Sequence, residues 1–396
     1  MRATVTADRL WTGSEIIDHP IVAIEDRRIV SIASRASDGA VEGNGKSLDF
    51  SGATLAPAFF DVHFHGAAGH DVMEAAPEAL SAIGALLACH GTASYLATTV
   101  TAPLETTLRA LSGLARIVQK PHLLGNLEKI ARPLGIHLEG PFLSHAKRGV
   151  QPQEHLLAPD IATFDRLYEA AEGQVRLMTL APELPGAVEL IAHASARGVR
   201  VSLGHSDAKT EEARAAIAAG AVSATHTFNA MRPLDHREPG ILGVVLTDDA
   251  LYAELICDGI HVCPEMVKLW WRAKGDQRGI LVTDAMSATG MPDGEYQLGG
   301  FAVQVANGRA MAHGVLAGSV LTLDRALENF VEFTSAPVEK ALRLLTANPA
   351  AMTGLGGRAG NLAPGMPADL VAVDRRGRLT GAILGGSIMD GQFAVT

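Results

Sequence analysis

The sequence predicts an α/β protein: a closed (β/α)8 barrel with a small β-sandwich domain formed by both termini. Three observations predict it: eight apolar runs alternate with helical stretches, the chain has 396 residues, and its two ends are alike in texture. A (β/α)8 barrel typically uses about 250 residues, so a barrel and a smaller domain fit this length. We expect the small domain at residues 1–52 and 359–396, and the barrel at 53–358.

The eight apolar runs are expected to be the barrel strands. In chain order they read TLAPAFFDVHFHG, SYLATTVT, LGIHLEGPF, RLMTLAPE, VRVSLGHSDA, VSATHTFNAM, YAELICDGIHV and GILVTDAM. Helix-like stretches such as EEARAAIAAG lie between them, and this alternation predicts a parallel sheet with crossover helices. Eight repeats favour a closed barrel over the alternative, an open doubly wound sheet. No GxGxxG follows the first run, which disfavours a dinucleotide-binding fold.

Both ends of the chain read as β structure. IVAIEDRRIVSIA near the N-terminus and ADLVAVDRRGRLTGAILGG near the C-terminus each contain apolar runs around a polar turn, as in a β-hairpin. Because the two segments flank the middle of the chain, we expect them in one small β domain.

The composition excludes several classes of protein. Hydrophobic residues make up 47% and charged residues 19%, which predicts a large core rather than disorder. The net charge is -10 and no basic stripe is present, so we expect no nucleic-acid partner. The stretch 79–104 contains no Asp, Glu, Lys or Arg, but HGT interrupts it. We therefore expect a buried helix, a turn and a buried strand there, and no membrane span.

Cysteine usage and the first residues bear on the compartment. Cys89, Cys257 and Cys263 show no CxxC spacing, so we expect three buried thiols rather than a disulfide framework. The opening MRATVTADRL has no apolar signal core. We expect a cytoplasmic protein.

Potential metal ligands end five of the eight runs. In chain order they are His63, His65, Glu139, His205, His226 and Asp284. A lone HxH is usually a pair of packed or solvated histidines. This set is more informative, because its members recur at the same place in a repeating unit. Barrel enzymes place their sites at the C-terminal ends of the strands, so we expect these side chains to converge.

The residue types in this set predict hydrolytic chemistry. Neutral imidazoles and a carboxylate suit Zn2+ or Fe2+. Such an ion lowers the pKa of bound water to about 7. Asp284 is the carboxylate placed to take the proton from that water and return it to a leaving group. The sequence therefore predicts a metal-dependent hydrolase.

Other polar residues near the strand ends have weaker assignments. His137 lies two residues before Glu139, and we expect it to pack or to support a ligand rather than bind metal. Asp61 lies two before His63, and both orientation of a ligand and direct ligation stay open. His261 follows the seventh run, where a substrate contact is expected. The remaining histidines considered, expected to be structural or solvated, are His19, His70, His90, His122 and His193.

Two loop segments are candidates for ligand contact. HTFNAMRPLDHREPG carries Asn229, Arg232 and Arg237, and an Arg on a loop at the barrel mouth is suited to clamp an anion. Pairing of that Arg with a local acid such as Glu238 is an equally open alternative. The LAGS run at 316–319 either contacts a ligand or caps a helix N-terminus.

In this order, the motifs resemble the N-acetylglucosamine-6-phosphate deacetylase family of the amidohydrolase superfamily. The motifs are DVHFHG, HLEGPF, LGHSDA, THTFNAM, REPG, CDGIHV, LVTDAM and LAGS, and they span almost the whole chain. HLEGPF with THTFNAM and REPG is the specific part. DVHFHG and the closing PADL are shared across the superfamily.

The resemblance implies a role for each matching residue. Glu139, His205 and His226 would hold the main metal, and Asp284 would be the catalytic acid and base. His63 and His65 would hold a second ion, bridged by Glu139, so one or two ions of Zn or Fe(II) are expected. The implied substrate-binding residues are Val150, Gln151, Asn229, Ala230, Arg237, His261, Ala317, Gly318 and Ser319.

The resemblance also implies a substrate and an assembly. The substrate would be an amino-sugar phosphate, N-acetyl-D-glucosamine 6-phosphate, and the protein a homodimer with Arg237 reaching the neighbouring subunit's site. One departure is that the family's KGAH-like turn, whose His polarises the acetyl carbonyl, reads KRGVQP here. Gln151 stands at the matching place and donates a hydrogen bond without positive charge.

Two alternative functions are weighed. The first is deacylation of an N-acyl-D-amino acid or another N-acetylated sugar. Cyclic-amidase relatives are disfavoured, because they place a carbamylated Lys on a barrel strand where this chain has Glu139. The second is a non-catalytic scaffold, which is disfavoured because a buried polar cluster is costly to keep without a function.

Overall fold

The computed structural model describes residues 2–35 and 46–389. Its centre is an eight-stranded parallel sheet in the order β15-β14-β13-β12-β11-β10-β9-β6. The strands are β6 (Phe59–Phe64), β9 (Thr92–Thr99), β10 (Arg132–Glu139), β11 (Val175–Leu180), β12 (Arg200–Leu203), β13 (Ala221–Ala224), β14 (Tyr252–Ile256) and β15 (Gly279–Val282). Each strand overlaps one of the eight apolar runs, so the predicted strand set is confirmed.

The first and last strands of this sheet meet just beyond β15. The backbone N–H of Asp284 donates to the carbonyl of His63 over 2.9 Å, and His65 N–H donates to the Ala285 carbonyl over 2.8 Å. Phe64 and Ala285 form a parallel bridge. The sheet is thus nearly closed, which confirms a barrel and excludes the open doubly wound alternative.

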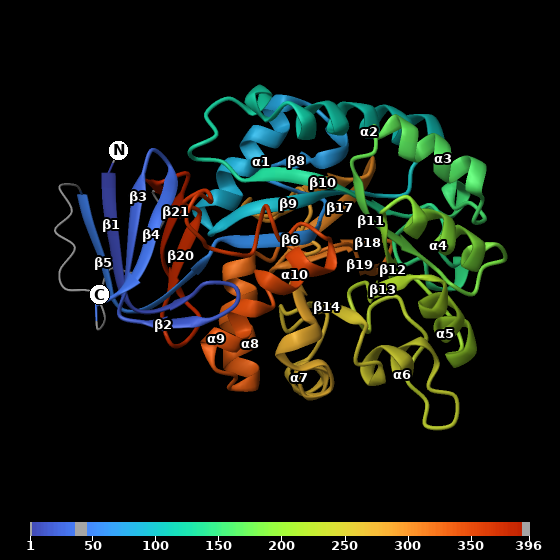
Figure 1. Ribbon diagram of the computed structural model, residues 1–396. Helices are drawn as coiled ribbons and strands as arrows, with labels where there is room; N and C mark the ends of the chain where they lie inside the picture. The colour runs from blue at the N-terminus through green and yellow to red at the C-terminus, as the bar shows by residue number, and fades with distance from the viewer. Residues whose placement is uncertain (1, 36–45, 390–396) are drawn as a thin grey trace.

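Helices follow the barrel strands and cover them from outside (Figure 1). They are α1 (Pro77–Cys89), α2 (Leu104–Gln119), α3 (Ile161–Ala170), α4 (Ala187–Ala196), α5 (Thr210–Ala219), α6 (Gly240–Thr247), α7 (Pro264–Arg278) and α8 (Leu323–Thr334), with α9 (Val338–Arg343) and α10 (Ala347–Met352) after α8. In α2, Leu111, Leu114 and Val118 recur at helical spacing and are buried. The predicted helix, turn and strand at 79–104 are α1 and β9. Within the described ranges, no helix is long and apolar enough to cross a membrane.

Strands from both ends of the chain form a second sheet beside the barrel (Figure 1). It contains β1 (Arg2–Trp11), β2 (Ile16–Asp18), β3 (Pro20–Glu25), β4 (Arg28–Ser34), β5 (Lys46–Pro57), β20 (Leu370–Val373), β21 (Leu379–Leu384) and β22 (Ser387–Ile388). The two expected hairpins are the antiparallel pairs β3–β4 and β20–β21. Antiparallel pairing of β20 with β5 joins the two ends. Because β5 crosses residue 52, the sheet does not itself mark a domain limit there.

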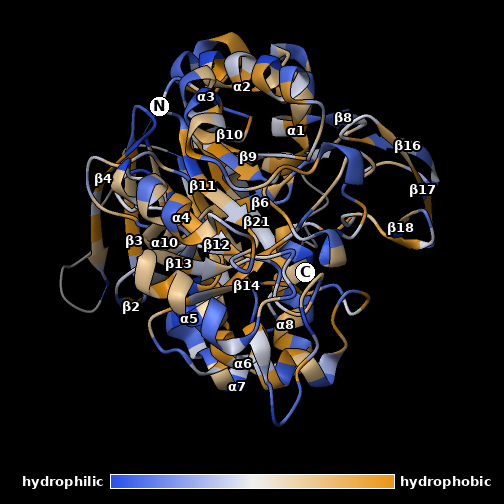
Figure 2. Cartoon of the chain, turned by 90° about the vertical axis from the view of Figure 1, so that its right-hand side faces the viewer, coloured by the Kyte–Doolittle hydropathy of each residue, from blue (hydrophilic) through white to orange (hydrophobic). Residues whose placement is uncertain are grey.

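A small antiparallel sheet interrupts the chain between β15 and α8, and sequence analysis did not anticipate it. Its strands are β16 (Gly294–Leu298), β17 (Phe301–Ala306), β18 (Arg309–Ala312) and β19 (Val315–Leu316). Buried Val303 and Val305 alternate with exposed neighbours and share an apolar cluster with Val100 and Met286. In Figure 2, β16–β18 project at one side of the barrel. The short pair β7 (Gly66–Ala67) and β8 (His70–Asp71) follows β6.

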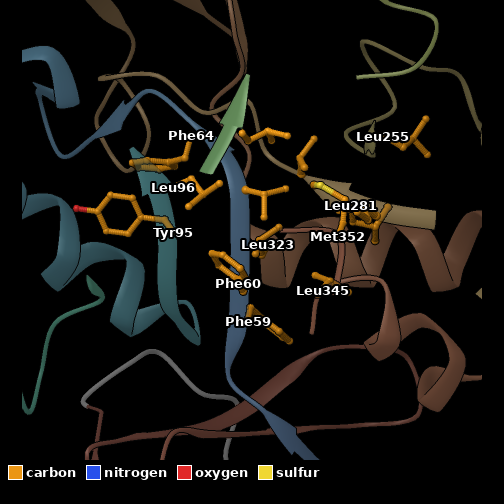
Figure 3. Close-up of a cluster of buried hydrophobic side chains, with 14 of the residues drawn as sticks. Phe59, Phe60, Phe64, Tyr95, Leu96, Leu255, Leu281, Leu323, Leu345 and Met352 are labelled. Carbon is orange, nitrogen blue, oxygen red and sulfur yellow. The ribbon is translucent and has the colours of Figure 1, made fainter. Parts of the chain in front are cut away.

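Strand β6 divides its side chains between two environments. Phe60 and Phe64 belong to the buried apolar cluster, and Figure 3 shows them among side chains such as Leu96 and Leu323. The Phe64 ring centroid lies 5.3 Å from that of Tyr95. Successive strand residues point to opposite faces, so this packing directs the intervening histidine toward the barrel interior. A one-residue slip would exchange the two faces, and apolar burial opposes it.

The cysteines depart in part from expectation. Cys257 is buried, Cys89 is half-buried and Cys263 is exposed. The prediction of three buried thiols is therefore correct only for Cys257, since Cys263 lies at the surface where α7 begins.

Candidate metal centre

The carboxylate of Glu139, the last residue of β10, lies at the centre of the polar cluster. Its Oε1 is 3.2 Å from Nε2 of His63. The same oxygen is 3.1 Å from Nε2 of His205 and 3.2 Å from Nε2 of His226. Its Oε2 is 3.4 Å from Nε2 of His65. All five side chains are buried, so the four imidazoles converge on one carboxylate away from bulk water.

Asp284 completes the cluster from the segment after β15. That segment hydrogen-bonds to β6 where the barrel closes, a place we call the seam. Oδ1 of Asp284 lies 3.1 Å from Nε2 of His65 and 3.5 Å from Nε2 of His63. The ligand atoms form overlapping groups in which all members lie within 4.8 Å of one another. The groups are Glu139 with His205 and His226, His63 with His65 and Glu139, and His63 with His226 and Asp284.

Three members of the cluster occupy the left-handed backbone region. His205, His226 and Asp284 each lie two residues beyond a strand, with φ of 47°, 25° and 51°. Such conformations cost about 1–3 kcal/mol each in non-glycine residues and persist where the surroundings fix them. Their recurrence at three strand ends indicates that the backbone is bent to direct these side chains into the barrel.

The outer nitrogens of three imidazoles have fixed partners. Nδ1 of His65 lies 3.0 Å from the Thr98 carbonyl, and Nδ1 of His205 lies 3.0 Å from the Lys147 carbonyl. Nδ1 of His63 instead faces Oε2 of Glu254 over 3.2 Å. A donated Nδ1–H leaves the Nε2 lone pair directed at the cluster, which is the arrangement of a metal-binding histidine.

The cluster fits a divalent cation. Among the described residues, Nε2 of His63 is buried without a hydrogen-bond partner. The Nε2 atoms of His205 and His226 face each other over 3.1 Å. A cation bound by imidazole nitrogens and carboxylate oxygens would give the His63 nitrogen a partner and would lie between the two facing lone pairs. This donor set suits Zn2+ and Fe2+.

The electrostatics keep both central carboxylates ionised. Burial opposes ionisation of Glu139, but the His63 and His205 imidazoles hold the pKa of its carboxyl well below the ordinary value. Burial likewise opposes ionisation of Asp284, and His63 and His65 lower its pKa. An ionised Asp284 is able to accept a proton.

Two buried polar residues support the cluster from below. Nε2 of His137 lies 2.8 Å from the Thr179 hydroxyl and its Nδ1 lies 3.1 Å from the Val62 carbonyl, so it packs beneath the ligands as predicted. Asp61 accepts hydrogen bonds from the Thr283 hydroxyl over 2.6 Å and from His63 N–H over 3.2 Å. Burial raises the pKa of Asp61 to about 7. Of its two open roles, these contacts favour orientation over ligation.

A cavity of about 210 Å3 opens onto the cluster. Its lining residues are His65, Val100, Glu139, Gly149, Val150, Gln151, His205, His226, Asn229, Ala230, His261, Asp284, Leu298, Val315, Leu316 and Gly318. The predicted substrate residues among them are Val150, Gln151, Asn229, Ala230, His261 and Gly318.

Three other predicted substrate residues lie outside this lining. Arg237 is exposed on the loop that precedes α6. Ala317 and Ser319 are buried. The Ser319 hydroxyl donates to the Thr283 carbonyl over 2.6 Å, and its N–H donates to the Asp284 carbonyl over 2.7 Å, so it supports Asp284. The N-cap of α8 is Thr322, which makes the helix-cap alternative for LAGS wrong.

Gln151 is engaged at both ends of its amide. Its Nε2 donates to Oε2 of Glu139 over 2.7 Å, and its Oε1 accepts from the Thr101 N–H over 2.8 Å. Because the NH2 group already binds the central carboxylate, this geometry favours a role in holding Glu139 over direct polarisation of a substrate carbonyl.

His261 is the basic group at the cavity wall. Its Nδ1 lies 2.6 Å from Oδ2 of Asp258. Burial disfavours the imidazolium, but the hydrogen bond and charge of Asp258 outweigh that effect and raise the pKa of His261 above its ordinary value. A protonated His261 is a hydrogen-bond donor suited to an anionic or developing negative oxygen.

Sequence reasoning missed two acids near the cluster, one buried and one half-buried. Glu254 on β14 is fully buried, and the single charge within the apolar YAELI was the signal that could have found it. Glu183 accepts from the Ser206 hydroxyl over 2.8 Å and from Asp207 N–H over 2.6 Å, which holds the loop after His205. No sequence pattern marks Glu183, because its role depends on a neighbouring loop.

Comparison with known proteins identifies relatives along most of the chain. Residues 54–389 match the amidohydrolase family. An N-acetylgalactosamine-6-phosphate deacetylase of Escherichia coli O157:H7 is 42% identical over 321 residues, which cover 81% of this chain and 83% of the relative. An N-acetylglucosamine-6-phosphate deacetylase of Lysinibacillus sphaericus is 39% identical over 369 residues, which cover 93% of this chain and 92% of the relative.

Solved structures of deacetylases also superpose on most of the chain. The crystal structure of N-acetyl-D-glucosamine-6-phosphate deacetylase from Mycobacterium smegmatis superposes with a TM-score of 0.88 at 36% identity, over 98% of this chain and all of that one (100%). A mutant of that enzyme in complex with N-acetyl-D-glucosamine-6-phosphate has a TM-score of 0.89 at 36% identity, over 98% of this chain and 99% of that one.

Proposed function

Because this chain belongs to the amidohydrolase family, we propose that it hydrolyses the N-acetyl group of N-acetyl-D-glucosamine 6-phosphate, in amino-sugar catabolism. The products are D-glucosamine 6-phosphate and acetate. The observation that carries this proposal is the convergence of four imidazoles and two carboxylates beside one cavity at the strand ends. Relatives with this activity in their names cover more than nine-tenths of the chain, which supports the choice of substrate.

The proposed metal is Zn2+ or Fe2+, with one or two ions per subunit. Glu139, His205 and His226 would hold the first ion, and His63 and His65 would share Glu139 in holding the second. A divalent cation in such a site polarises the amide carbonyl and lowers the pKa of water.

Asp284 is the proposed proton carrier. Its carboxylate faces the cavity and is ionised, so it takes a proton as water adds to the acetyl carbon. The same carboxyl then protonates the sugar nitrogen as the C–N bond breaks, and a neutral amine leaves rather than an amide anion. The acetate oxygen gained comes from that water.

His261 and Gln151 are proposed to act at different places. His261, whose imidazolium form Asp258 favours, is assigned to donate to the carbonyl oxygen as negative charge develops there. Gln151 holds the Glu139 carboxylate, and its own contacts leave polarisation of the carbonyl to other groups.

The remaining substrate contacts stay proposals. Val150, Asn229, Ala230 and the segment 317–319 are assigned to the sugar pocket, and Arg237 to the phosphate. Because Arg237 is exposed in the single chain, we propose that it serves the site of a second copy in a homodimer. A cytoplasmic location and the domain limits 1–52 with 359–396 and 53–358 also remain proposals.

A second candidate substrate is N-acetyl-D-galactosamine 6-phosphate, which differs only in the configuration at one sugar carbon. It is favoured by the 42% identity to the deacetylase of that name. The test is acetate release from both sugars, each with and without its phosphate. A higher kcat/KM for the glucosamine derivative supports the first proposal, and the reverse supports the second. No release from any of them contradicts both.

Arg237→Ala tests the phosphate assignment. We expect KM to rise about tenfold or more for the phosphorylated sugars, the usual effect of losing a charged hydrogen bond, and to change little for the unphosphorylated ones. Arg214→Ala, on the neighbouring α5, is the matched control. Equal effects on phosphorylated and unphosphorylated sugars would argue against Arg237 as the phosphate clamp.

A further inference from the structure

Glu254 is a charged side chain buried in the barrel wall and outside the ligand cluster. It lies in the middle of β14, with no exposed surface. Its Oε2 accepts from Nδ1 of His63 over 3.2 Å and lies 3.4 Å from the backbone N–H of His226. Its Oε1 is buried and has no hydrogen-bond partner among the described residues. An ionised group in such a place is costly unless a nearby positive charge compensates it.

The partner of Glu254 distinguishes His63 from the other imidazoles. Nδ1 of His65 and of His205 each face a neutral backbone carbonyl. Only His63, among these three, has a carboxylate behind it. A carboxylate behind a ligand histidine raises the basicity of the opposite nitrogen and strengthens its bond to a metal.

The distribution of acidic groups around the cluster also distinguishes His63. Glu139 and Asp284 bring two negative charges to the cavity side, and one divalent cation balances them. Glu254 adds a third negative charge, directed at the His63 side of the cluster rather than at His205. The Glu254 carboxylate thus favours a positive partner at the opposite nitrogen of the His63 ring, the side on which a second cation would lie.

We propose that Glu254 is a positioning residue whose negative charge, acting through Nδ1 of His63, makes the His63 and His65 side of the cluster bind a second divalent cation. This inference rests on the proposed metal-dependent function. It says nothing about which sugar is hydrolysed, so it fails or survives separately from the substrate assignment.

Glu254→Gln is the sharpest test, because glutamine keeps the volume and an acceptor oxygen and removes the charge. Purified protein is stripped with a chelator and titrated with Zn2+ by calorimetry, with elemental analysis of the saturated sample. Wild type should bind two ions. In the variant, the second ion should bind about 10–100-fold more weakly and the first ion unchanged, the usual cost of losing an outer partner.

Asp324→Asn is the matched control, since Asp324 also lies behind Nδ1 of a histidine, at 3.0 Å, but that histidine, His90, lies outside the ligand cluster. It should keep both ions. Glu254→Asp retains the charge and should bind the second ion more tightly than Glu254→Gln. Co2+ titration followed by visible absorption reports occupancy independently of turnover, and melting temperature confirms that each variant is folded.

Several results would overturn the proposal. The first is a wild type that binds only one ion at saturating Zn2+. The second is a Glu254→Gln variant whose second-ion affinity is unchanged, or in which both ions are weakened equally. The others are a Glu254→Asp variant that binds the second ion more weakly than Glu254→Gln, and an equal loss of the second ion in Asp324→Asn. Two ions without acetate release would contradict the proposed deacetylase activity and leave the role of Glu254 intact.

Discussion

The two sides of the polar cluster are built differently although they share Glu139. On one side, His205 and His226 follow their strands by two residues in left-handed turns, and a neutral carbonyl supports His205. On the other side, His63 belongs to β6 itself and His65 follows it. Their backbones hydrogen-bond to the segment that carries Asp284, and a buried carboxylate supports His63.

This difference suggests how one barrel can separate metal binding from proton transfer. The His205 side depends on loops, which Glu183 and Lys147 fix from outside the barrel. The His63 side depends on the place where the barrel closes: His63 lies in β6, and backbone hydrogen bonds join His65 to Ala285 and Asp284 to His63. We expect the first side to determine binding of the main ion, and the second to determine reactivity.

Glu139→Ala should have the largest effect, because it removes the carboxylate that both sides share. We expect loss of both ions, with affinity falling more than the roughly 100-fold upper cost of losing an outer partner, and activity below detection. Elemental analysis and acetate release measure the two effects. Retention of either ion at wild-type affinity would show that the sides are independent and that Glu139 is not their bridge.

Asp284→Asn should distinguish the roles of the two sides, by impairing proton transfer without loss of the main ion. Removing the proton carrier should lower kcat by about 100-fold or more, while the main ion at Glu139, His205 and His226 stays bound. Turnover and metal content are measured on the same preparation. A turnover close to that of wild type would remove Asp284 from the mechanism, and loss of the main ion would show that the seam also holds it.

Gln151→Leu should have an intermediate effect. It removes the hydrogen bond that holds Oε2 of Glu139, and we expect kcat to fall about tenfold with little change in KM. Initial rates over a range of substrate concentration distinguish the outcomes. A selective rise in KM would instead mean that the amide contacts substrate directly.

His90→Gln should have the smallest effect, since the His90–Asp324 pair is a partly exposed counterpart of His63–Glu254. Its Nδ1–Oδ2 distance is 3.0 Å. Burial disfavours the imidazolium, but Asp324 raises the pKa of His90 above the ordinary value. The stabilisation is therefore complete below about pH 6.5 and lost as the pH rises through the higher folded-state pKa. Solvent screening limits it to below about 1 kcal/mol.

The measurement for this pair is the melting temperature of wild type and His90→Gln across pH 5–9. The variant should melt lower at acidic pH by at most about 2 °C, with the difference shrinking toward pH 9. A difference that grows with pH would have the wrong sign for a raised histidine pKa.

The barrel could be predicted because its signals are local. Each strand is an apolar run of its own, and the hairpins at both ends carry polar turns within a few residues. Sheet β16–β19 was missed although FAVQVA alternates like a strand, because the eight repeats already accounted for a complete barrel.

The cluster itself could be predicted where ligands repeat at strand ends, as His63, Glu139 and His226 do. Supporting residues could not be found this way. Gln151 reaches Glu139 from a loop, and Glu254 approaches His63 from β14, a strand far from β6 in the sequence, so both roles appear only when distant segments are folded together. The exposure of Arg237 is likewise a property of the folded loop and not of its sequence pattern.

The most direct test of the account is acetate release from N-acetyl-D-glucosamine 6-phosphate by the purified protein, before and after chelation and after addition of Zn2+ or Fe2+. We predict turnover that falls with the bound metal and returns when an ion is restored. Full activity in metal-free protein, or no acetate from fully metal-loaded protein, would contradict the assignment of this chain as a metal-dependent deacetylase.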